Sequence, residues 1–360
     1  MTELPGVTDA ATPPADRATE PRVDREPHAD RAEPRADWAD PGWQDAALDW
    51  VADHLARLGR RVAGPVEPRL RPWSLVWRVP TDSGDVWFKA NNPGTRHEAA
   101  LLAALARLVP GRVLDPVAVD AGRGWSLLPD GGRSLRDALG GDRSLLARWE
   151  QVLPEYADLQ RTVAPRAGEL LAAGVPDHRP EVLPALFEAL LDDEDSLLLG
   201  AEDGLTAEAH ERLRAHRARF AEDCRRLAGT GIAPTIQHDD LHDGNVFVAD
   251  DGHRFFDWGD ASVAHPFGTL LVTLNSVAYT FKLPEGDPAL ARLRDAYLEP
   301  WSDRHDPATL REAARLAVRV SRVSRALSWR RALQTLDPAR AEYASAVPGW
   351  LQELFEPDPV

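Results

Sequence analysis

Acidic, histidine and amide side chains are concentrated in one segment, Gln237-His238-Asp239-Asp240-Leu241-His242-Asp243-Gly244-Asn245-Val246-Phe247-Val248. A turn-like stretch at 250–253 and a second apolar run that ends at Asp257 follow it. This pattern predicts two short strands that pair about a turn. Counting outward from Asp251 places Asn245 and Asp257 opposite each other. Since cross-strand neighbours lie close together, we expect their oxygen atoms to bind one Mg²⁺ ion.

Asp240 lies five residues before Asn245, on the loop that enters this hairpin. From there its carboxylate is expected to orient and deprotonate a hydroxyl that approaches a metal-bound phosphate. Such chemistry also needs a cation at the phosphates. Lys89 is a candidate, because it is one of two lysines in a chain with 40 arginines. Glu98, in the helix that follows, is expected to hold Lys89 by an ion pair.

The surrounding sequence predicts a small β-rich lobe that leads into a larger helical lobe. Apolar runs at 73–79 and 86–90 flank a Gly-containing loop, and this pattern predicts a β-hairpin. Periodic apolar residues predict helices, and shorter β-rich runs predict strands. The expected helices cover 43–58, 96–108, 145–171, 182–199, 207–228 and 307–333, and further strands are expected at 113–119, 124–128 and within 234–258.

Three segments are expected along the chain. Residues 1–41 are rich in proline and acidic residues and nearly free of large apolar residues, so they are predicted to form a disordered tail. Residues 42–132 are expected to form an N-lobe with an antiparallel sheet and one helix. Residues 133–357 are expected to form a helical C-lobe that carries the loop and hairpin around Asp240. The predicted fold class is therefore α+β.

The arrangement His238-x-Asp240-x-x-x-x-Asn245, followed by Asp257, resembles the aminoglycoside phosphotransferase family. The resemblance covers most of residues 70–335 and implies the bilobal fold of protein kinases. It further implies ATP or GTP with Mg²⁺, and transfer of the γ-phosphate to a small-molecule hydroxyl. In that scheme Asp240 is the base, and Asn245 and Asp257 are Mg²⁺ ligands. Lys89 contacts the α- and β-phosphates with Glu98 as its partner.

Three positions depart from the family pattern. Asp239 stands where the family usually has glycine, and Asp257 is followed by Trp258-Gly259 rather than Phe-Gly. A Gly-rich phosphate loop is missing from the sequence. The matching turn covers residues 71–74, where Ser74 and backbone amides are expected to contact phosphate.

The composition restricts the partners. A formal net charge of −16 argues against nucleic acid. The negative charge suits a cationic acceptor, although a need for solubility explains the same charge equally well. The single cysteine, Cys224, and the lack of a long apolar run predict a cytoplasmic protein with no membrane partner. A basic stretch within 319–331 is expected to face carboxylates.

Two other functions compete with a small-molecule kinase. The first is a catalytically silent kinase-fold protein with a binding or regulatory role, although Lys89, Asp240, Asn245 and Asp257 are all present. The second is a metal-dependent hydrolase that binds zinc or a metal pair through His238 and His242. The acceptor itself is left open, since the fold also serves kinases of choline, homoserine, sugars and antibiotics.

Overall fold

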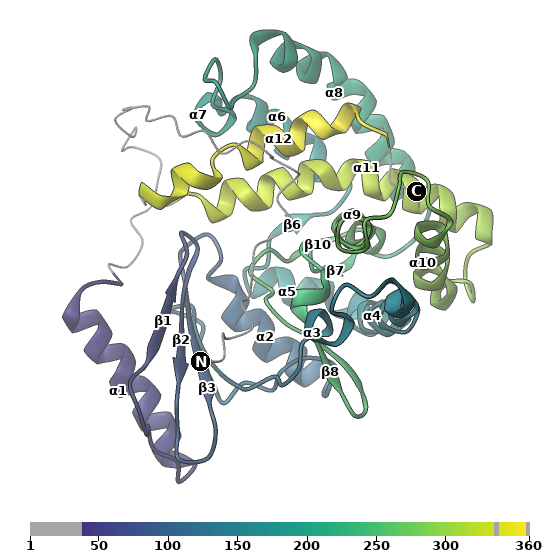
Figure 1. Cartoon of the computed structure of the whole chain (residues 1–360). Helices are drawn as coiled ribbons and strands as arrows, with labels where there is room; N and C mark the ends of the chain where they lie inside the picture. The colour runs from purple at the N-terminus through teal and green to yellow at the C-terminus, as the bar shows by residue number, and fades with distance from the viewer. Residues whose placement is uncertain (1–37, 335–337, 358–360) are drawn as a thin grey trace.

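The computed structural model describes residues 38–334 and 338–357 of the chain. A twisted sheet with α1 on its outer side occupies one end of the molecule, and the C-terminal helices occupy the other (Figure 1). The five strands of the sheet are antiparallel and follow the order β1-β2-β3-β5-β4. They are β1 (Glu67–Leu70), β2 (Ser74–Val79), β3 (Val86–Asn91), β4 (Ala118–Asp120) and β5 (Trp125–Pro129).

Helix α1 (Pro41–Arg57) covers one face of this sheet. It begins after Asp40, whose carboxylate accepts a hydrogen bond of 2.8 Å from the backbone N–H of Trp43. Its apolar stripe packs on alternate residues of β3, among them Phe88 and Ala90. Lys89, between these two residues, consequently points to the opposite face of the sheet. Helix α2 (His97–Leu108) lies on that side.

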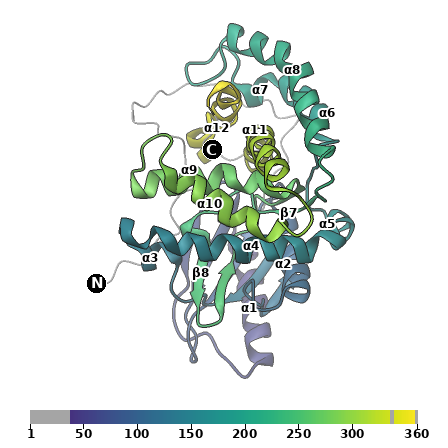
Figure 2. The ribbon, with the colours of Figure 1, turned by 90° about the vertical axis from the view of Figure 1, so that its right-hand side faces the viewer.

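The remaining helices form the larger part of the molecule. Helix α11 (Pro307–Ala332) runs through it and contacts α6, α8, α9 and α12, as the end-on view of α11 in Figure 2 shows. The other α-helices are α3 (Leu135–Leu139), α4 (Trp149–Val163), α5 (Ala167–Ala172), α6 (Leu183–Leu191), α7 (Glu194–Leu197), α8 (Ala207–Ala228), α9 (Leu270–Phe281), α10 (Pro288–Leu298) and α12 (Ala346–Gln352). Short 3-10 helices are η1 (Arg143–Arg148), η2 (Ala164–Arg166), η3 (Asp243–Asn245), η4 (Pro266–Thr269), η5 (Glu299–Trp301), η6 (Pro338–Tyr343) and η7 (Glu353–Phe355).

Two small sheets complete the β-structure. In the first, β10 (Ser262–Ala264) pairs with β6 (Asp177–His178) and with β7 (Thr235–Gln237). The second is the hairpin of β8 (Val246–Ala249) and β9 (Gly252–Phe255). The loop between β7 and β8 carries Asp240, and the segment after β9 carries Asp257.

Most elements agree with the sequence predictions, but the strands β1, β6 and β10 were not predicted, and the helix expected at 182–199 is divided into α6 and α7. The strand expected at 113–119 is shorter and begins at Ala118, while Val113 forms an isolated bridge with Phe255. The helix expected at 145–171 is divided into η1, α4, η2 and α5. The predicted disordered tail lies outside the described residues except for its last four, where Trp38 is buried and Pro41 begins α1. Within the described residues, none of the helices is long and apolar enough to span a bilayer.

Candidate active site

Lys89 forms ion pairs with two carboxylates that come from distant parts of the chain. Its Nζ lies 2.7 Å from Oε2 of Glu98 and 2.6 Å from Oδ1 of Asp257. Glu98 lies in the first turn of α2, and Asp257 follows β9. The ion pair between Lys89 and Glu98 that the sequence predicts is therefore present, and Asp257 joins it.

Glu98 connects three elements through one buried carboxylate. Besides Lys89, its Oε1 accepts a hydrogen bond of 3.0 Å from the backbone N–H of Trp258. Its Oε2 accepts one of 2.9 Å from Nδ2 of Asn91. Helix α2, strand β3 and the segment that follows Asp257 are thus fixed relative to one another.

The three charged groups shift one another's pKa. Burial alone would lower the pKa of Lys89, but the carboxylates of Asp257 and Glu98 outweigh it and raise that pKa above its ordinary value. Burial would raise the pKa of Asp257, yet Lys89 holds it below the usual range. For Glu98 the effect of burial exceeds the opposing effect of Lys89, so the pKa of Glu98 is raised. Lys89 and Asp257 are consequently charged at neutral pH.

The register of the β8–β9 hairpin differs from the prediction by one residue. Val246 pairs with Phe255, so that Asn245 lies opposite Phe256 rather than Asp257. The turn consists of residues 250 and 251 alone, because Gly252, with φ of 129°, already begins β9. Asp257 adopts a left-handed φ of 64°, a conformation that costs free energy for a residue with a side chain.

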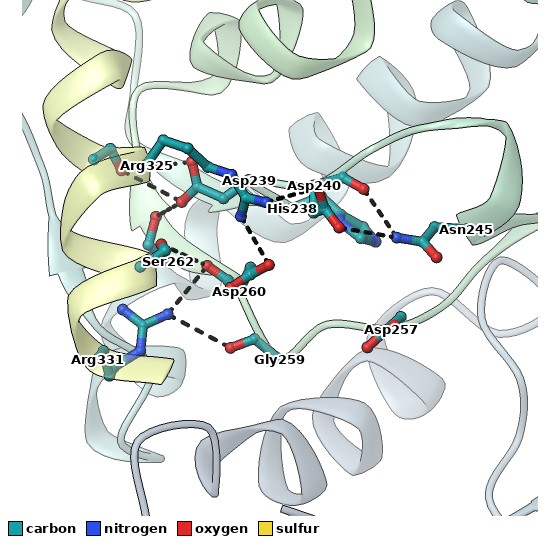
Figure 3. A network of polar contacts seen from close by, with 12 residues as sticks. His238, Asp239, Asp240, Asn245, Asp257, Gly259, Asp260, Ser262, Arg325 and Arg331 are labelled. Atoms are coloured by element: carbon teal, nitrogen blue, oxygen red, sulfur yellow. Dashed lines mark hydrogen bonds and ion pairs between the residues drawn. The ribbon is translucent and has the colours of Figure 1, made fainter. Parts of the chain in front are cut away.

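Asp240 and Asn245 lie side by side on the loop that enters β8. Nδ2 of Asn245 donates a hydrogen bond of 3.0 Å to the backbone oxygen of Asp240 and lies 3.5 Å from its Oδ2. Oδ1 of Asn245 is buried and has no hydrogen-bond partner among the described residues. Figure 3 shows Asp240 between Arg325 and Asn245, with Asp257 on a separate segment nearby.

Arg325, on α11, bridges two aspartates. It donates hydrogen bonds of 2.9 Å to Oδ1 of Asp240 and 2.7 Å to Oδ2 of Asp260, and its side chain is 1% exposed (Figure 3). Burial opposes the charge on Asp260, but Arg325 lowers the pKa of that carboxyl below its usual range. The expectation that the basic stretch of this helix faces carboxylates is confirmed for Arg325 and for Arg330, which lies 2.6 Å from Asp193. The contact with Asp240 itself was not predicted.

A model of the phosphotransferase enzyme family matches residues 65–268, more than half of the chain. The chain belongs to this family. The match includes Lys89, Glu98, Asp240, Asn245 and Asp257, and it ends before α11. No curated protein matches the sequence at a significant level.

Solved structures of small-molecule kinases share the fold at low sequence identity. An ethanolamine kinase of Plasmodium vivax is 11% identical with a TM-score of 0.57, over 86% of this chain and 89% of that one. An aminoglycoside phosphotransferase in complex with GDP and kanamycin is 16% identical with a TM-score of 0.54, over 86% and 98%. A choline/ethanolamine kinase family protein of Mesorhizobium loti is 19% identical with a TM-score of 0.51, over 86% and 95%. The fold is thus the bilobal, protein-kinase-like α+β fold expected from the sequence.

The backbone at Asp239 explains why glycine is usual at this position in the family. Asp239 has a left-handed φ of 62°, which glycine adopts without steric cost and which aspartate tolerates better than most residues. Its carboxylate accepts hydrogen bonds from Gln237, Ser262 and Ser324. Burial raises the pKa of Asp239 to about 6, although Ser262 and the nearby arginines act against the shift.

His238 and His242 hold the loop around Asp240 in place. Nε2 of His238 donates a hydrogen bond of 2.8 Å to the backbone oxygen of Phe256, and its backbone N–H donates to the hydroxyl of Tyr156. Nδ1 of His242 accepts a hydrogen bond of 2.9 Å from the backbone N–H of Gly244. Nε2 of His242 lies 3.6 Å from Oδ2 of Asp240.

Ser74 lies apart from the other candidate residues. It is buried at the start of β2 and pairs with Asn91 in β3 rather than with Lys89. Within the described residues, no hydrogen bond joins its side chain to Lys89 or Asp257. The turn before it contacts α11 instead, since the ring centroid of Trp73 lies 5.6 Å from that of Trp329.

Proposed function

We propose that the chain transfers the γ-phosphate of a nucleoside triphosphate, ATP or GTP, to a hydroxyl of a small molecule. The observation that carries this proposal is the convergence of Lys89, Glu98 and Asp257 beside the loop of Asp240 and Asn245. Residues 42–132 would bind the nucleotide, and residues 133–357 would supply the catalytic loop and the acceptor site. The reaction would take place in the cytoplasm.

Asn245 and Asp257 fit a magnesium ion. The buried Oδ1 of Asn245, which has no hydrogen-bond partner among the described residues, is an acceptor that a hard cation would satisfy. Asp257 supplies an ionised carboxylate. Two protein ligands suffice, because Mg²⁺ in such sites completes its coordination with water and phosphate oxygens. When bound, the ion neutralises charge on the phosphates.

Each remaining residue has a defined task in this proposal. Lys89 would contact the α- and β-phosphates, with Glu98 fixing its position. Asp240 would accept the proton of the acceptor hydroxyl through Oδ2, since Oδ1 is held by Arg325. Ser74 is buried, so the backbone amides of the turn at 71–74 are better placed than its hydroxyl to contact phosphate.

The acceptor is proposed to be a small alcohol. The names of two structural neighbours refer to ethanolamine or choline, and a third neighbour is complexed with kanamycin. Ethanolamine, choline and kanamycin are all cationic molecules. The acidity of the chain is consistent with a cationic acceptor. A hydrolase is less well supported, because His238 and His242 are engaged with the backbone and no group of three metal-binding side chains occurs in the described part of the chain. A silent binding protein is disfavoured by the complete set of candidate residues.

The proposal is tested by incubating the protein with ATP or GTP, Mg²⁺ and a panel of alcohols that includes choline, ethanolamine and aminoglycosides. Release of nucleoside diphosphate that depends on one acceptor, with a phosphorylated product found by mass spectrometry, would support it. Asp240→Asn serves as the catalytic control. Nucleotide binding without turnover of any acceptor would favour the binding or regulatory protein instead.

A further inference from the structure

A cavity of about 310 Å³ lies between α2, α5 and the end of α11. Arg96 and His97 line it from the start of α2, and Arg331 lines it from α11. None of the eleven described residues that form its wall is acidic, although the chain contains 58 aspartates and glutamates. The wall is therefore unusually basic for this protein.

Neither arginine of this cavity forms an ion pair with a carboxylate of the described residues, although the charges of Asp260 and Asp239 act on Arg331 from nearby. Arg96 is exposed, and its guanidinium forms neither a hydrogen bond nor an ion pair with any residue that the structure describes. Arg331 donates only to backbone oxygens, at 3.2 Å to Asp260 and 3.5 Å to Gly259. Arg325 and Arg330, on the same helix, each bind a carboxylate. Guanidinium groups that line one cavity and form no ion pair are suited to an oxyanion.

His97 adds a buried polar atom without a partner. The residue is 9% exposed, and its Nε2 has no hydrogen-bond partner among the described residues. A buried nitrogen in this state costs free energy unless another group supplies the hydrogen bond. A ligand hydroxyl would satisfy either tautomer of the ring, because a hydroxyl both donates and accepts.

A second cavity, of about 250 Å³, adjoins the first and shares Pro176, Arg331 and Gln334 with it. Its wall includes the apolar side chains of Leu186 and Leu327. The same wall also includes Asp177, His178 and Arg330. The two cavities together therefore offer a basic compartment for an anionic group and, beside it, a compartment with both apolar and polar side chains for a hydroxylated carbon skeleton.

We infer that these two cavities bind a small phosphate monoester that carries a hydroxyl group, with its phosphate between Arg96 and Arg331. The site is distinct from the one around Asp240, but it touches the same supporting elements.

His97 directly precedes Glu98 in α2, and Arg331 binds the backbone that follows Asp257. If a ligand in these cavities changes the affinity for nucleotide by some factor, nucleotide must change the affinity for that ligand by the same factor, because binding free energies are reciprocal. Binding of the ester itself does not depend on the proposed phosphotransfer.

Isothermal titration calorimetry with glycerol 3-phosphate and with inorganic phosphate tests the inference. The variant is Arg96→Ala, and the control is Arg107→Ala, which removes the same charge from an exposed position of α2 outside the cavity. We expect Arg96→Ala to weaken binding of the ester at least about tenfold, the loss of one charge-assisted hydrogen bond, while Arg107→Ala leaves it unchanged. Arg96→Glu should abolish binding, and unchanged melting temperatures would show that both variants fold.

Three other outcomes of this titration would contradict the inference or part of it. No binding of either compound to the wild-type protein at millimolar concentration would overturn the inference. Equal affinity of the ester for wild type and Arg96→Ala would overturn it as well, because the phosphate would then bind elsewhere. Tighter binding of the ester than of inorganic phosphate would support the role of the second cavity, and equal binding of the two compounds would refute that role.

Discussion

The guanidinium of Arg325 donates a hydrogen bond of 2.9 Å to the carboxylate of Asp240, 85 residues earlier in the chain. A second hydrogen bond to Asp260 fixes the planar guanidinium between the two carboxylates. The catalytic loop is thereby attached to α11, which also contacts the helices of the larger part of the molecule. The proposed base is thus oriented by a residue that lies beyond the family match.

Replacing Arg325 should cost much more stability than replacing a surface arginine of the same helix. Arg325→Ala leaves the buried carboxylate of Asp240 and the partly buried carboxylate of Asp260 without their shared counterion, and we expect a loss of about 3–5 kcal/mol. Arg315→Ala removes a partly exposed ion pair with Glu312 and should cost less than about 1 kcal/mol. Urea unfolding of both variants measures the difference. Equal losses would show that Arg325 contributes no more than a surface pair.

Asp240→Asn should separate catalysis from nucleotide binding. The amide cannot accept the proton of the acceptor hydroxyl, so kcat should fall by about 10²–10⁴. The dissociation constant of the nucleotide should stay unchanged, since Lys89 and Asp257 are untouched. Steady-state kinetics with the acceptor found in the screen, together with nucleotide titration, test this. Wild-type kcat in the variant would refute the assignment of Asp240 as base.

The positive φ of Asp239 predicts an order of stability for two variants. Asp239→Gly and Asp239→Ala lose the same hydrogen bonds to Gln237, Ser262 and Ser324. Alanine in addition adopts a left-handed conformation, at a cost of about 1–2 kcal/mol. Asp239→Gly should therefore be the more stable variant in urea unfolding. An alanine variant as stable as the glycine variant would contradict the backbone argument.

The sequence predicts those contacts that local spacing determines. Lys89 and Glu98 lie in consecutive elements, so the alternation of β3 and the first turn of α2 are sufficient to bring them together. The hairpin register was predicted wrongly because it depends on the number of turn residues, and Gly252 belongs to the strand. The contact between Arg325 and Asp240 depends on how α11 packs across the molecule. No periodicity in the sequence encodes that arrangement.

Buried histidines should make the protein sensitive to acid. Burial lowers the pKa of His97, His178 and His265 to about 3 in the folded protein, well below the value near 6.5 of an unfolded chain. Between these values the unfolded chain binds protons that the folded protein does not. Stability is then fully present above about pH 6.5 and is lost as the pH falls, by up to about 1.4 kcal/mol per pH unit for each histidine. Asp239, whose pKa is raised to about 6, acts in the opposite direction.

His265→Asn isolates one of these contributions. Nδ1 of His265 accepts a hydrogen bond from the backbone N–H of Phe267, and asparagine can replace it as a helix cap. The free energy of unfolding of the variant should fall less steeply than that of the wild type between about pH 6.5 and pH 4.5. Urea unfolding at several pH values measures the two slopes. Parallel curves would show that His265 does not contribute.

Nucleotide binding that depends on Mg²⁺ is the most direct test of the proposed function. The melting temperature is measured with ATP and with GTP, each with and without Mg²⁺, for wild type, Asp257→Ala and the hairpin-turn control Asp251→Ala. Nucleotide at about 100 times its dissociation constant stabilises the folded state by about 2.7 kcal/mol. We predict an upward shift of several degrees that requires Mg²⁺, persists in Asp251→Ala and is lost in Asp257→Ala. The absence of a shift with either nucleotide in the wild-type protein would contradict the proposed function.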